Sequence, residues 1–531
     1  MNRTLGSVAL NVAALTLAGR VLGFGRSVVF SKTVGDTCLG DAYNAANLAP
    51  NVLFEVVAGG VLAGVVIPVV ARHVGAGRRA ETGLTVSALL TWTLLVLTPA
   101  GLAALVGARF YAEALAKPDC ANSAATLAAL LVMFVPQIWL YGVAVVSAGV
   151  LQAHQRFAAA AAAPLLSSGV VIVSYLGFAA LAGPVGGPDL TGTTRAALGV
   201  LGWGTTAGVL CLALCTAVPL TRLGLRLRPR LGFAPGDRSV IARIAAAGLV
   251  GLVLQQLSVL VIAWAAQQSP DPGALTRFTW ANAIYLLPYA VLAAPLLQLV
   301  FPRLAAAAEQ GQDAVAEVLR EQAPLVVALA WLGAALLVAT SVPVARVFVL
   351  GPGSGRTEAL SWPVAAFAPA VLGFSLLGLA SRSLLAQHRA RGSGAATSTA
   401  WVAVIIGVLV VRLTVPPGWL VTGLAGAVSV GMLLGALTGW ILLRRALGAG
   451  RSVPLGRPLL AGLAAAAPAT ALTGWLGAWL ADATIVAAGL GALGLAVACT
   501  ALYLVLLRLL HPALARQLVR LIGGRVPVGQ A

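Results

Sequence analysis

Long apolar segments recur along the whole chain, and each is long enough to cross a lipid bilayer as a helix. A span needs about 20 apolar residues, and a helix satisfies its own backbone hydrogen bonds in the bilayer interior. The chain is 60% hydrophobic and 9% charged, whereas a soluble domain carries about 25% charged residues. We therefore expect an all-α polytopic membrane protein with about 14 transmembrane helices. The predicted helices cover residues 7–34, 42–71, 83–108, 123–153, 157–183, 196–221, 239–267, 275–302, 323–350, 359–387, 395–415, 418–443, 457–481 and 483–509.

The basic residues are distributed unevenly between the predicted loops. If the N-terminus is cytoplasmic, most of the 34 Lys and Arg residues fall in cytoplasmic loops or in the tail. Such a bias sets the orientation of a membrane protein, so both termini are predicted to be cytoplasmic. The net charge of +19 is spread over short loops between apolar runs. This pattern predicts contact with anionic membrane lipids and gives no support for nucleic acid.

The N-terminus and the five cysteines give further expectations. No small-residue cleavage site follows a short apolar segment, so the first helix is predicted to be retained. Cys38 and Cys120 both fall in loops predicted to lie outside. A disulfide between them is one possibility, because sequence alone does not give connectivity. Cys211 and Cys215 lie one turn apart in an apolar segment, and no cysteine spacing indicates a metal site.

The sequence also contains a weak internal repeat. Residues 134–157 resemble residues 367–391, with His154 matched to His388, at offsets of 233 to 235. A second pair with nearly the same offset is Ala46-Asn47 leading to Pro68, against Ala281-Asn282 leading to Pro302. Six helices separate equivalent positions, so the repeats have parallel topology, which is a common plan among transporters.

The repeat predicts the domain organisation. The predicted parts are an N-lobe at 1–222, an Arg-rich cytoplasmic loop at 223–238, a C-lobe at 239–445, two appended helices at 446–510 and a basic tail at 511–531. The lobes are predicted to be pseudo-symmetric six-helix units. The tail reads HPALARQLVRLIGG at its start, which predicts a short amphipathic helix lying on the inner leaflet.

Polar residues gather within the apolar stretch at residues 19–68. An ionisable residue at membrane depth is costly, so the cluster predicts a functional site that faces a cavity. The candidate substrate-binding residues are Arg20, Arg26, Asp41, Glu55, Asn47 and Asn51, with Asn44 on the same helical face as the other asparagines.

Each charged candidate has a functional and a structural interpretation. An arginine fork suits a phosphate group, so Arg20 and Arg26 are predicted to bind a diphosphate. Alternatively, Arg26 extends to the membrane interface, and Arg20 pairs with Glu55 or Asp41. Asp41 could also be a helix N-cap, and Glu55 could exchange protons during transport. The asparagines could instead form hydrogen bonds between helices.

Other kinds of chemistry find no support in the sequence. No Asp or Glu lies inside the predicted helices of the C-lobe, so a carboxylate-based cation site is not expected there. No P-loop is present, and the four histidines fall at predicted helix ends. We expect a transporter with no catalytic residue, no metal and no cofactor.

The first two helices carry a family resemblance. The pieces RVLGFGR and DAYNAANLAPN, and the later ANAIYLLPYAVLAAPLLQLVFPRL, resemble the MurJ (MviN) lipid II flippase family. The resemblance implies a member of the multidrug/oligosaccharidyl-lipid/polysaccharide exporter superfamily in the bacterial plasma membrane. It also implies that Arg20, Arg26 and Asp41 serve a central cationic cavity for the undecaprenyl-diphosphate-linked precursor. Cell-wall synthesis proteins would be possible partners.

Two departures from the family pattern leave alternatives open. Paired arginines of many members are replaced here by Phe54 and Glu55, and an arginine in helix 8 by Asn282-Ala283. The P-N-x-x-F-E form resembles an actinobacterial branch. Lipid II flipping from the inner to the outer leaflet is the leading hypothesis. Another polyprenyl-diphosphate-linked glycan, cation-coupled multidrug export and a non-transporting cell-wall scaffold are the alternatives.

Overall fold

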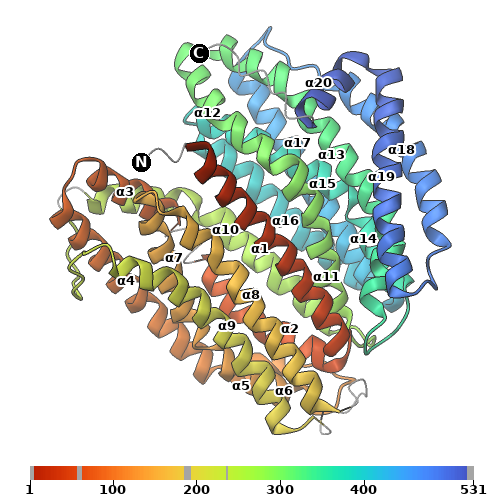
Figure 1. Ribbon diagram of the computed structural model, residues 1–531. Coiled ribbons are helices and arrows are strands. Elements are labelled where there is room, and N and C mark those ends of the chain that lie inside the picture. The colour runs from red at the N-terminus through yellow and green to blue at the C-terminus, as the bar shows by residue number, and fades with distance from the viewer. Residues whose placement is uncertain (1–4, 57–62, 184–189, 191–192, 235–236, 523–531) are drawn as a thin grey trace. The chain divides into compact units, whose positions relative to one another are not determined.

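The computed structural model contains two compact units (Figure 1). It describes residues 5–56, 63–183, 190, 193–234 and 237–522. Unit 1 comprises Met1–Thr276 with Gly351–Ser354, and unit 2 comprises Arg277–Leu350 with Gly355–Ala531.

Every predicted span overlaps helix in the part of the chain that the structure describes. Twelve of the described helical segments are long and apolar enough to cross a membrane. The predicted span at 42–71 is formed by two helices on either side of residues 57–62, which lie outside the described residues. Apolar side chains such as Val173 and Val497 are 69% and 71% exposed. The all-α polytopic fold is therefore confirmed, with apolar faces left for lipid.

Unit 1 contains the first ten helices and the start of the eleventh. Their bounds are α1 Leu5–Thr33, α2 Cys38–Phe54, α3 Ala63–Gly75, α4 Arg79–Val106, α5 Ala108–Leu115, α6 Ser123–Phe134, α7 Gln137–Ala153, α8 Phe157–Ala182, α9 Arg195–Thr221, α10 Asp237–Gln267 and α11 Ala274–Pro288.

A buried aromatic cluster holds several helices of unit 1 together. The rings of Phe30, Tyr43, Phe134 and Tyr175 have centroids 5.0–6.0 Å apart in the recorded pairs. The Tyr43 hydroxyl lies 2.9 Å from the Tyr175 hydroxyl and 3.0 Å from Thr205 Oγ1. Ring packing and satisfied hydroxyl groups together fix α1, α2, α6, α8 and α9 in one arrangement.

Unit 2 contains the remaining helices. Their bounds are η2 Tyr289–Ala293, α12 Ala294–Gln310, α13 Gln312–Val349, α14 Glu358–Ala366, α15 Ala368–Ala386, α16 Ala390–Thr414, η3 Pro417–Trp419, α17 Leu420–Leu447, α18 Gly456–Ala478, α19 Ile485–Leu510 and α20 Pro512–Ile522.

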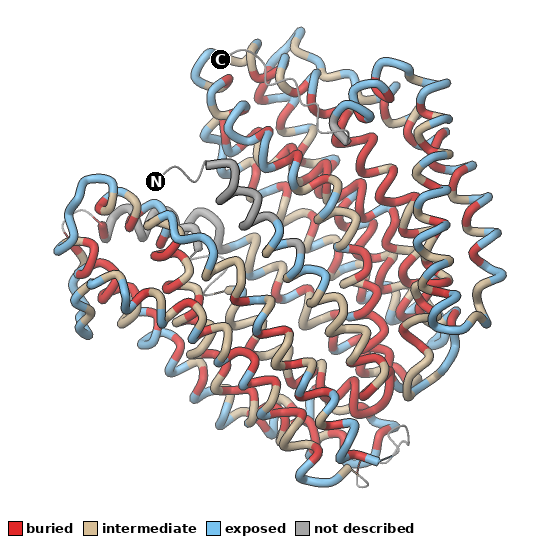
Figure 2. Tube along the Cα trace, viewed as in Figure 1, coloured by how far each residue is buried: buried red, intermediate tan, exposed pale blue. Residues whose placement is uncertain are grey.

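The long helix α13 is the core of unit 2. Within its apolar 18-residue segment, 72% of the residues are buried. Figure 2 shows buried residues along the length of the helix. It packs against α12, α15, α18 and α19. The hydroxyl of Tyr503 donates a hydrogen bond of 2.9 Å to the Ala328 carbonyl. This contact ties α19, one of the two appended helices, directly to α13.

The repeat predicted from sequence appears as two equivalent turns. The turn between α7 and α8 has Gln155 at φ 58°, and the turn between α15 and α16 has His388 at φ 58°. The next amide closes both turns, from Arg156 N to Leu151 O and from Arg389 N to Leu384 O, each at 2.8 Å.

This geometry corrects one pairing in the sequence repeat. The structure aligns His388 with Gln155, so the match of His388 to His154 is wrong by one residue. The position is set by the left-handed backbone that follows each helix end, which side-chain identity does not reveal.

The second repeated segment also has a structural counterpart. Helix α2 continues into π-helical backbone at Glu55 and Val56, and α11 continues into the π-helix η2 after Pro288. Glu55 and Tyr289 are separated by the repeat offset. A π segment widens a helix locally and is frequent at functional sites.

The tail forms the predicted amphipathic helix, α20. Leu514 and Leu518 on its apolar side are 1% and 0% exposed, and they belong to the core of unit 2. Protein therefore covers these two side chains, and the position of α20 on the inner leaflet stays a prediction. Residues 523–531 of the predicted tail lie outside the described residues.

The compact units divide the chain at a different place from the predicted lobes. Unit 1 continues through α10 to Thr276, whereas the predicted boundary is the loop at 223–238. The units group residues by contact, while the lobes group them by repeat. The lobes at 1–222 and 239–445 therefore remain a prediction.

Candidate functional site

Asp41 lies at the centre of a buried polar cluster in unit 1. Its side chain is fully buried and accepts hydrogen bonds from Gly273 N, Thr276 N and Thr276 Oγ1, each at 2.9 Å. Lys117 Nζ lies 3.5 Å from Asp41 Oδ2. Asp41 thus binds the first-turn amides of α11, where a negative charge is favourable. The N-cap of its own helix α2 is Thr37, so Asp41 is not the N-cap that the sequence suggested as one alternative.

A disulfide reinforces this cluster. Cys38 is bonded to Cys120, with their Cα atoms 5.9 Å apart. Cys38 precedes Asp41 by one helical turn, and Cys120 follows Lys117 by three residues. The bond therefore links the two chain segments that carry Asp41 and Lys117, the buried ion pair. The structure thus forms the pairing that the sequence left open.

A second acid ties a further turn to the same end of unit 1. Asp36 is 1% exposed and accepts hydrogen bonds from Ser354 N at 3.2 Å and Ser354 Oγ at 2.6 Å. Gly353 has φ 126°, and a Cβ there would collide with the Asp36 carboxylate. Only glycine allows this close approach. We call Asp36, Asp41, Lys117, Gly273 and Thr276 the Asp41 hub.

Arg26 lies in a different environment. It is half-buried on α1, one turn before Phe30 of the aromatic cluster. Its charge acts on the hydroxyl groups of Tyr43, Tyr141 and Tyr175. In the described part of the chain its guanidinium forms no hydrogen bond or ion pair. Arg26 is thus a cation among neutral aromatic groups, with its donors available.

Glu55 lies near the same group of tyrosines. It follows the last residue of α2, and its charge, like that of Arg26, acts on Tyr141. The ring of Phe54 packs on Tyr141 with centroids 4.4 Å apart. The side chain of Glu55 is exposed and forms no ion pair within the described residues. We call Arg26, Glu55 and Tyr141 the Arg26 face.

Arg20 is not brought to this face by any contact in the described residues. Helix α1 is continuous from Leu5 to Thr33, so Gly23 and Gly25 do not interrupt it. Six residues of helix separate the two arginines by about 9 Å and about 120°. Arg20 is exposed, and it forms no ion pair with Asp41 or Glu55. A Cβ at Gly23 or Gly25 would meet nothing within 4 Å, so this part of α1 borders open space.

The asparagines of α2 divide between the two environments. Asn44 Nδ2 donates to Gly40 O at 2.9 Å and to Thr276 Oγ1 at 3.0 Å, which places it beside the Asp41 hub. Asn47 is half-buried, and its Oδ1 has no hydrogen-bond partner among the described residues. Asn51 is also half-buried. Asn47 and Asn51 therefore have polar atoms available to a ligand. The side-chain amide of Asn44, in contrast, forms hydrogen bonds within the protein.

The structure also reveals a buried acid that the sequence did not single out. Asp237, in the first turn of α10, is fully buried and accepts a hydrogen bond of 2.6 Å from Thr85 Oγ1. His73 Nε2 lies 2.9 Å away, and Arg72 also contacts the carboxylate. The second ring nitrogen of His73 lies 3.0 Å from Glu81. This cluster joins α3, α4 and α10.

Sequence reasoning also missed Tyr141 and Lys117. Tyr141 lies in an apolar span with no periodic signal to mark it. Lys117 lies between the predicted helices 83–108 and 123–153, where a cation is expected to be exposed, yet it is 2% exposed. One signal was present: Lys117 lies three residues from Cys120, so a disulfide to Cys38 would bring it near Asp41. Within the described residues no group of three His, Cys, Asp or Glu side chains could hold a metal ion.

Comparison with known proteins gives consistent matches. The family model described as "Lipid II flippase MurJ" matches residues 30–493. A "Probable lipid II flippase MurJ" from Rhizobium meliloti is 27% identical over 350 residues, which is 63% of this chain and 61% of that protein. A "Lipid II flippase MurJ" from Burkholderia cenocepacia is 25% identical over 311 residues, 56% of each chain. The matched region thus spans less than two thirds of these curated relatives.

Solved structures show the same fold. A lipid II flippase MurJ in an inward closed conformation aligns with a TM-score of 0.73 at 16% identity, over 95% of this chain and 99% of that chain. An inward-facing multidrug resistance MATE family transporter of the MOP superfamily aligns with a TM-score of 0.63 at 13% identity. That alignment covers 83% of this chain and 98% of the transporter.

Proposed function

The chain belongs to the MurJ lipid II flippase family, and from this membership we propose that it moves lipid II across the membrane for peptidoglycan synthesis. The direction is from the inner to the outer leaflet, by alternating access between the lobes at 1–222 and 239–445. The protein is a transporter in this account, with the undecaprenyl-diphosphate-linked precursor as its substrate. The MATE-like fold agrees with this class of mechanism but does not identify a substrate.

The observation that carries the proposal is the state of Arg26. A half-buried arginine in an intramembrane helix, with no ion pair or hydrogen bond in the described residues, is costly unless a ligand repays the cost. A diphosphate offers oxygen atoms that match the guanidinium fork. Arg26 would bind one phosphate, and Arg20, about 9 Å along the same helix, would contact the remainder of the head group.

The neighbouring polar residues have supporting roles in this proposal. Glu55 limits the positive charge of the Arg26 face, so that the diphosphate is released as well as bound. Asn47 and Asn51 donate hydrogen bonds to the sugar or phosphate oxygens. Asp41 acts at a distance, because its carboxylate is occupied by α11 and Lys117. It positions the helix that carries the site and does not contact the substrate.

The finer assignments are also proposals. The form of residues 50–55, with Phe54 and Glu55 in place of arginines, favours an actinobacterial-like branch of the family. The arginine-rich loops favour a bacterial plasma membrane location with both termini cytoplasmic. Contact with anionic lipids and with cell-wall synthesis proteins follows from the same location.

Complementation of a flippase-depleted bacterial strain tests the proposal. The wild-type chain should restore growth, and Arg26→Ala should not, although it reaches the membrane at the wild-type level. Arg412→Ala, which removes an exposed arginine from the end of α16, is the matched control and should restore growth. Failure of the wild-type chain would point to another lipid-linked glycan. Full rescue by Arg20→Ala/Arg26→Ala would overturn the site and favour a scaffold role.

A further inference from the structure

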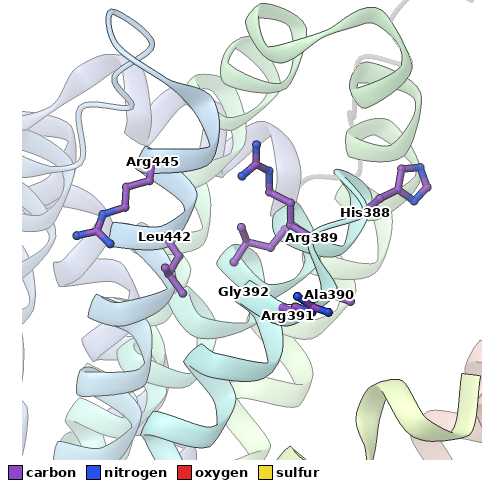
Figure 3. A pocket seen from close by; sticks show the side chains of 8 residues that line it. His388, Arg389, Ala390, Arg391, Gly392, Leu442 and Arg445 are labelled. Carbon is purple, nitrogen blue, oxygen red and sulfur yellow. The ribbon is translucent and has the colours of Figure 1, made fainter. Parts of the chain in front are cut away.

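A basic pocket lies in unit 2, lined by residues of α15, α16, α17 and the turn between α15 and α16. Its volume is about 650 Å³, and its lining includes His388, Arg389, Arg391, Leu442 and Arg445. Figure 3 shows Arg389 on one side of the pocket and Leu442 and Arg445 of α17 on the other, with the Arg445 side chain extended away from Arg389. The pocket is formed where the turn between α15 and α16 meets the end of α17.

The arginines of this pocket differ from two other arginines of unit 2 that form ion pairs. Arg451 binds Asp313 through two hydrogen bonds of 2.6 and 3.0 Å, and Arg303 donates to Glu321 at 2.8 Å. In contrast, the side chains of Arg389, Arg391 and Arg445 have no acidic partner in the described part of unit 2. These three exposed charges are therefore available to an anion from outside the protein.

The repeat shows that the pocket is not a by-product of the turn. The equivalent turn of unit 1 has the same backbone, but it carries Phe157 where unit 2 has Ala390, and Ala158 where unit 2 has Arg391. Replacing a phenylalanine by alanine opens space, and replacing alanine by arginine adds a charge. Both differences favour a bound anion in unit 2 alone.

The surface next to the pocket indicates the source of the anion. Leu437 and Ile441 of α17 are 57% and 42% exposed. They lie eight and four residues before Arg445, so the three side chains share one face of the helix. A soluble anion would make no contact with this apolar face. A phospholipid, in contrast, carries acyl chains next to its phosphate and could contact both. Basic pockets between helix ends are known to take anionic head groups.

We propose that this pocket binds the phosphate of an anionic phospholipid, with its acyl chains along the Leu437 and Ile441 face of α17. Arg389 binds the phosphate, Arg445 reaches it by rotation of its exposed side chain, and Arg391 adds a third charge. The site is separate from the Arg26 face and does not depend on the proposed transport activity.

Lipid binding to the purified full-length protein tests this proposal. Delipidated protein in detergent is titrated with phosphatidylglycerol, and bound lipid is counted by native mass spectrometry. A hydrogen bond to a charged group contributes about tenfold in affinity. We therefore expect Arg391→Ala, which installs the residue of the unit 1 turn, to weaken the tightest site about tenfold. Arg389→Gln/Arg391→Gln/Arg445→Gln should weaken it about a hundredfold or more.

Matched controls separate the pocket from general surface charge. Arg222→Gln/Arg226→Gln/Arg228→Gln removes three exposed arginines from a loop of unit 1 and should leave the tightest site within about threefold of wild type. An equal loss in both triple variants would overturn the proposal. Displacement of the bound lipid by millimolar inorganic phosphate would also overturn it, in favour of a soluble-anion site. Phosphatidylcholine should not occupy the site at the same concentrations.

Discussion

The Asp41 hub and the Arg26 face lie in the same unit, and both were predicted from the same stretch of sequence. Their charged side chains nevertheless lie in contrasting environments. Asp41 is fully buried, and four groups on two separate segments hold its carboxylate. Arg26 is half-buried and has no hydrogen bond or ion pair in the described residues. A charge whose partners are all internal stabilises the fold. A charge without internal partners is available to a ligand.

This contrast assigns different roles to residues that look alike in the sequence. Substitutions in the hub should lower stability, and substitutions on the Arg26 face should lower transport while leaving the fold intact. The predictions below test that separation.

The largest effect is expected from Asp41→Ala. Loss of the carboxylate leaves Lys117 buried without its counter-ion and leaves the first amides of α11 without an acceptor. Breaking a buried pair in this way costs about 3–5 kcal/mol, so the detergent-solubilised protein should unfold at a much lower temperature. Asp119→Ala, an exposed acid in the same loop as Lys117, is the control and should change stability by less than about 0.5 kcal/mol. Equal unfolding temperatures for Asp41→Ala and wild type would contradict the stabilising role of the hub.

The disulfide should have the next largest effect. Cys38→Ser/Cys120→Ser removes a cross-link between residues separated by 82 positions, and such a loss costs about 2–4 kcal/mol. Reductant should destabilise the wild type similarly and leave the double variant unchanged. Cys211→Ser/Cys215→Ser, which changes two free cysteines, should behave as wild type. Two free thiols at Cys38 and Cys120 in protein isolated from membranes would contradict this prediction.

Arg26→Ala should reduce transport without a matching loss of stability. Charge-assisted hydrogen bonds contribute about 1.5–3 kcal/mol, so export of the precursor per folded molecule should fall about 10- to 100-fold. Arg26→Lys should be intermediate, because lysine keeps the charge and loses the bidentate fork. Measurement of precursor at the outer leaflet, normalised to folded protein, checks both variants. A loss of folded protein equal to the loss of transport would instead make Arg26 structural.

Arg20→Ala should have the smallest effect of the four changes considered, after Asp41→Ala, loss of the disulfide and Arg26→Ala. Its side chain is exposed, and solvent weakens the interaction of an exposed charge to about 1 kcal/mol or less. Transport should fall by no more than about fivefold, and this effect should shrink as ionic strength rises. The same export assay in low and high salt measures it. A defect larger than that of Arg26→Ala would reverse the order of the two arginines.

The sequence predicted the helices well, because a membrane span is specified by apolar length alone. It predicted less of the site. Asp41 and Arg26 are both charged residues in an apolar stretch, and only the positions of Gly273, Thr276 and Lys117 show that Asp41 is occupied. Those partners are distant in sequence, and no local pattern links them. The repeat pairing at His388 was wrong for a similar reason, since backbone conformation and not residue type fixes the turn.

One comparison tests the central claim most directly: precursor export per folded molecule for wild type, Arg26→Ala and Asp41→Asn. Asp41→Asn keeps the shape and part of the hydrogen bonding of the hub, so the surviving folded protein should export within about threefold of wild type. Arg26→Ala should export at least about tenfold less than wild type. If Asp41→Asn abolishes export while Arg26→Ala preserves it, Asp41 contacts the substrate and the division of roles proposed for the two clusters is wrong.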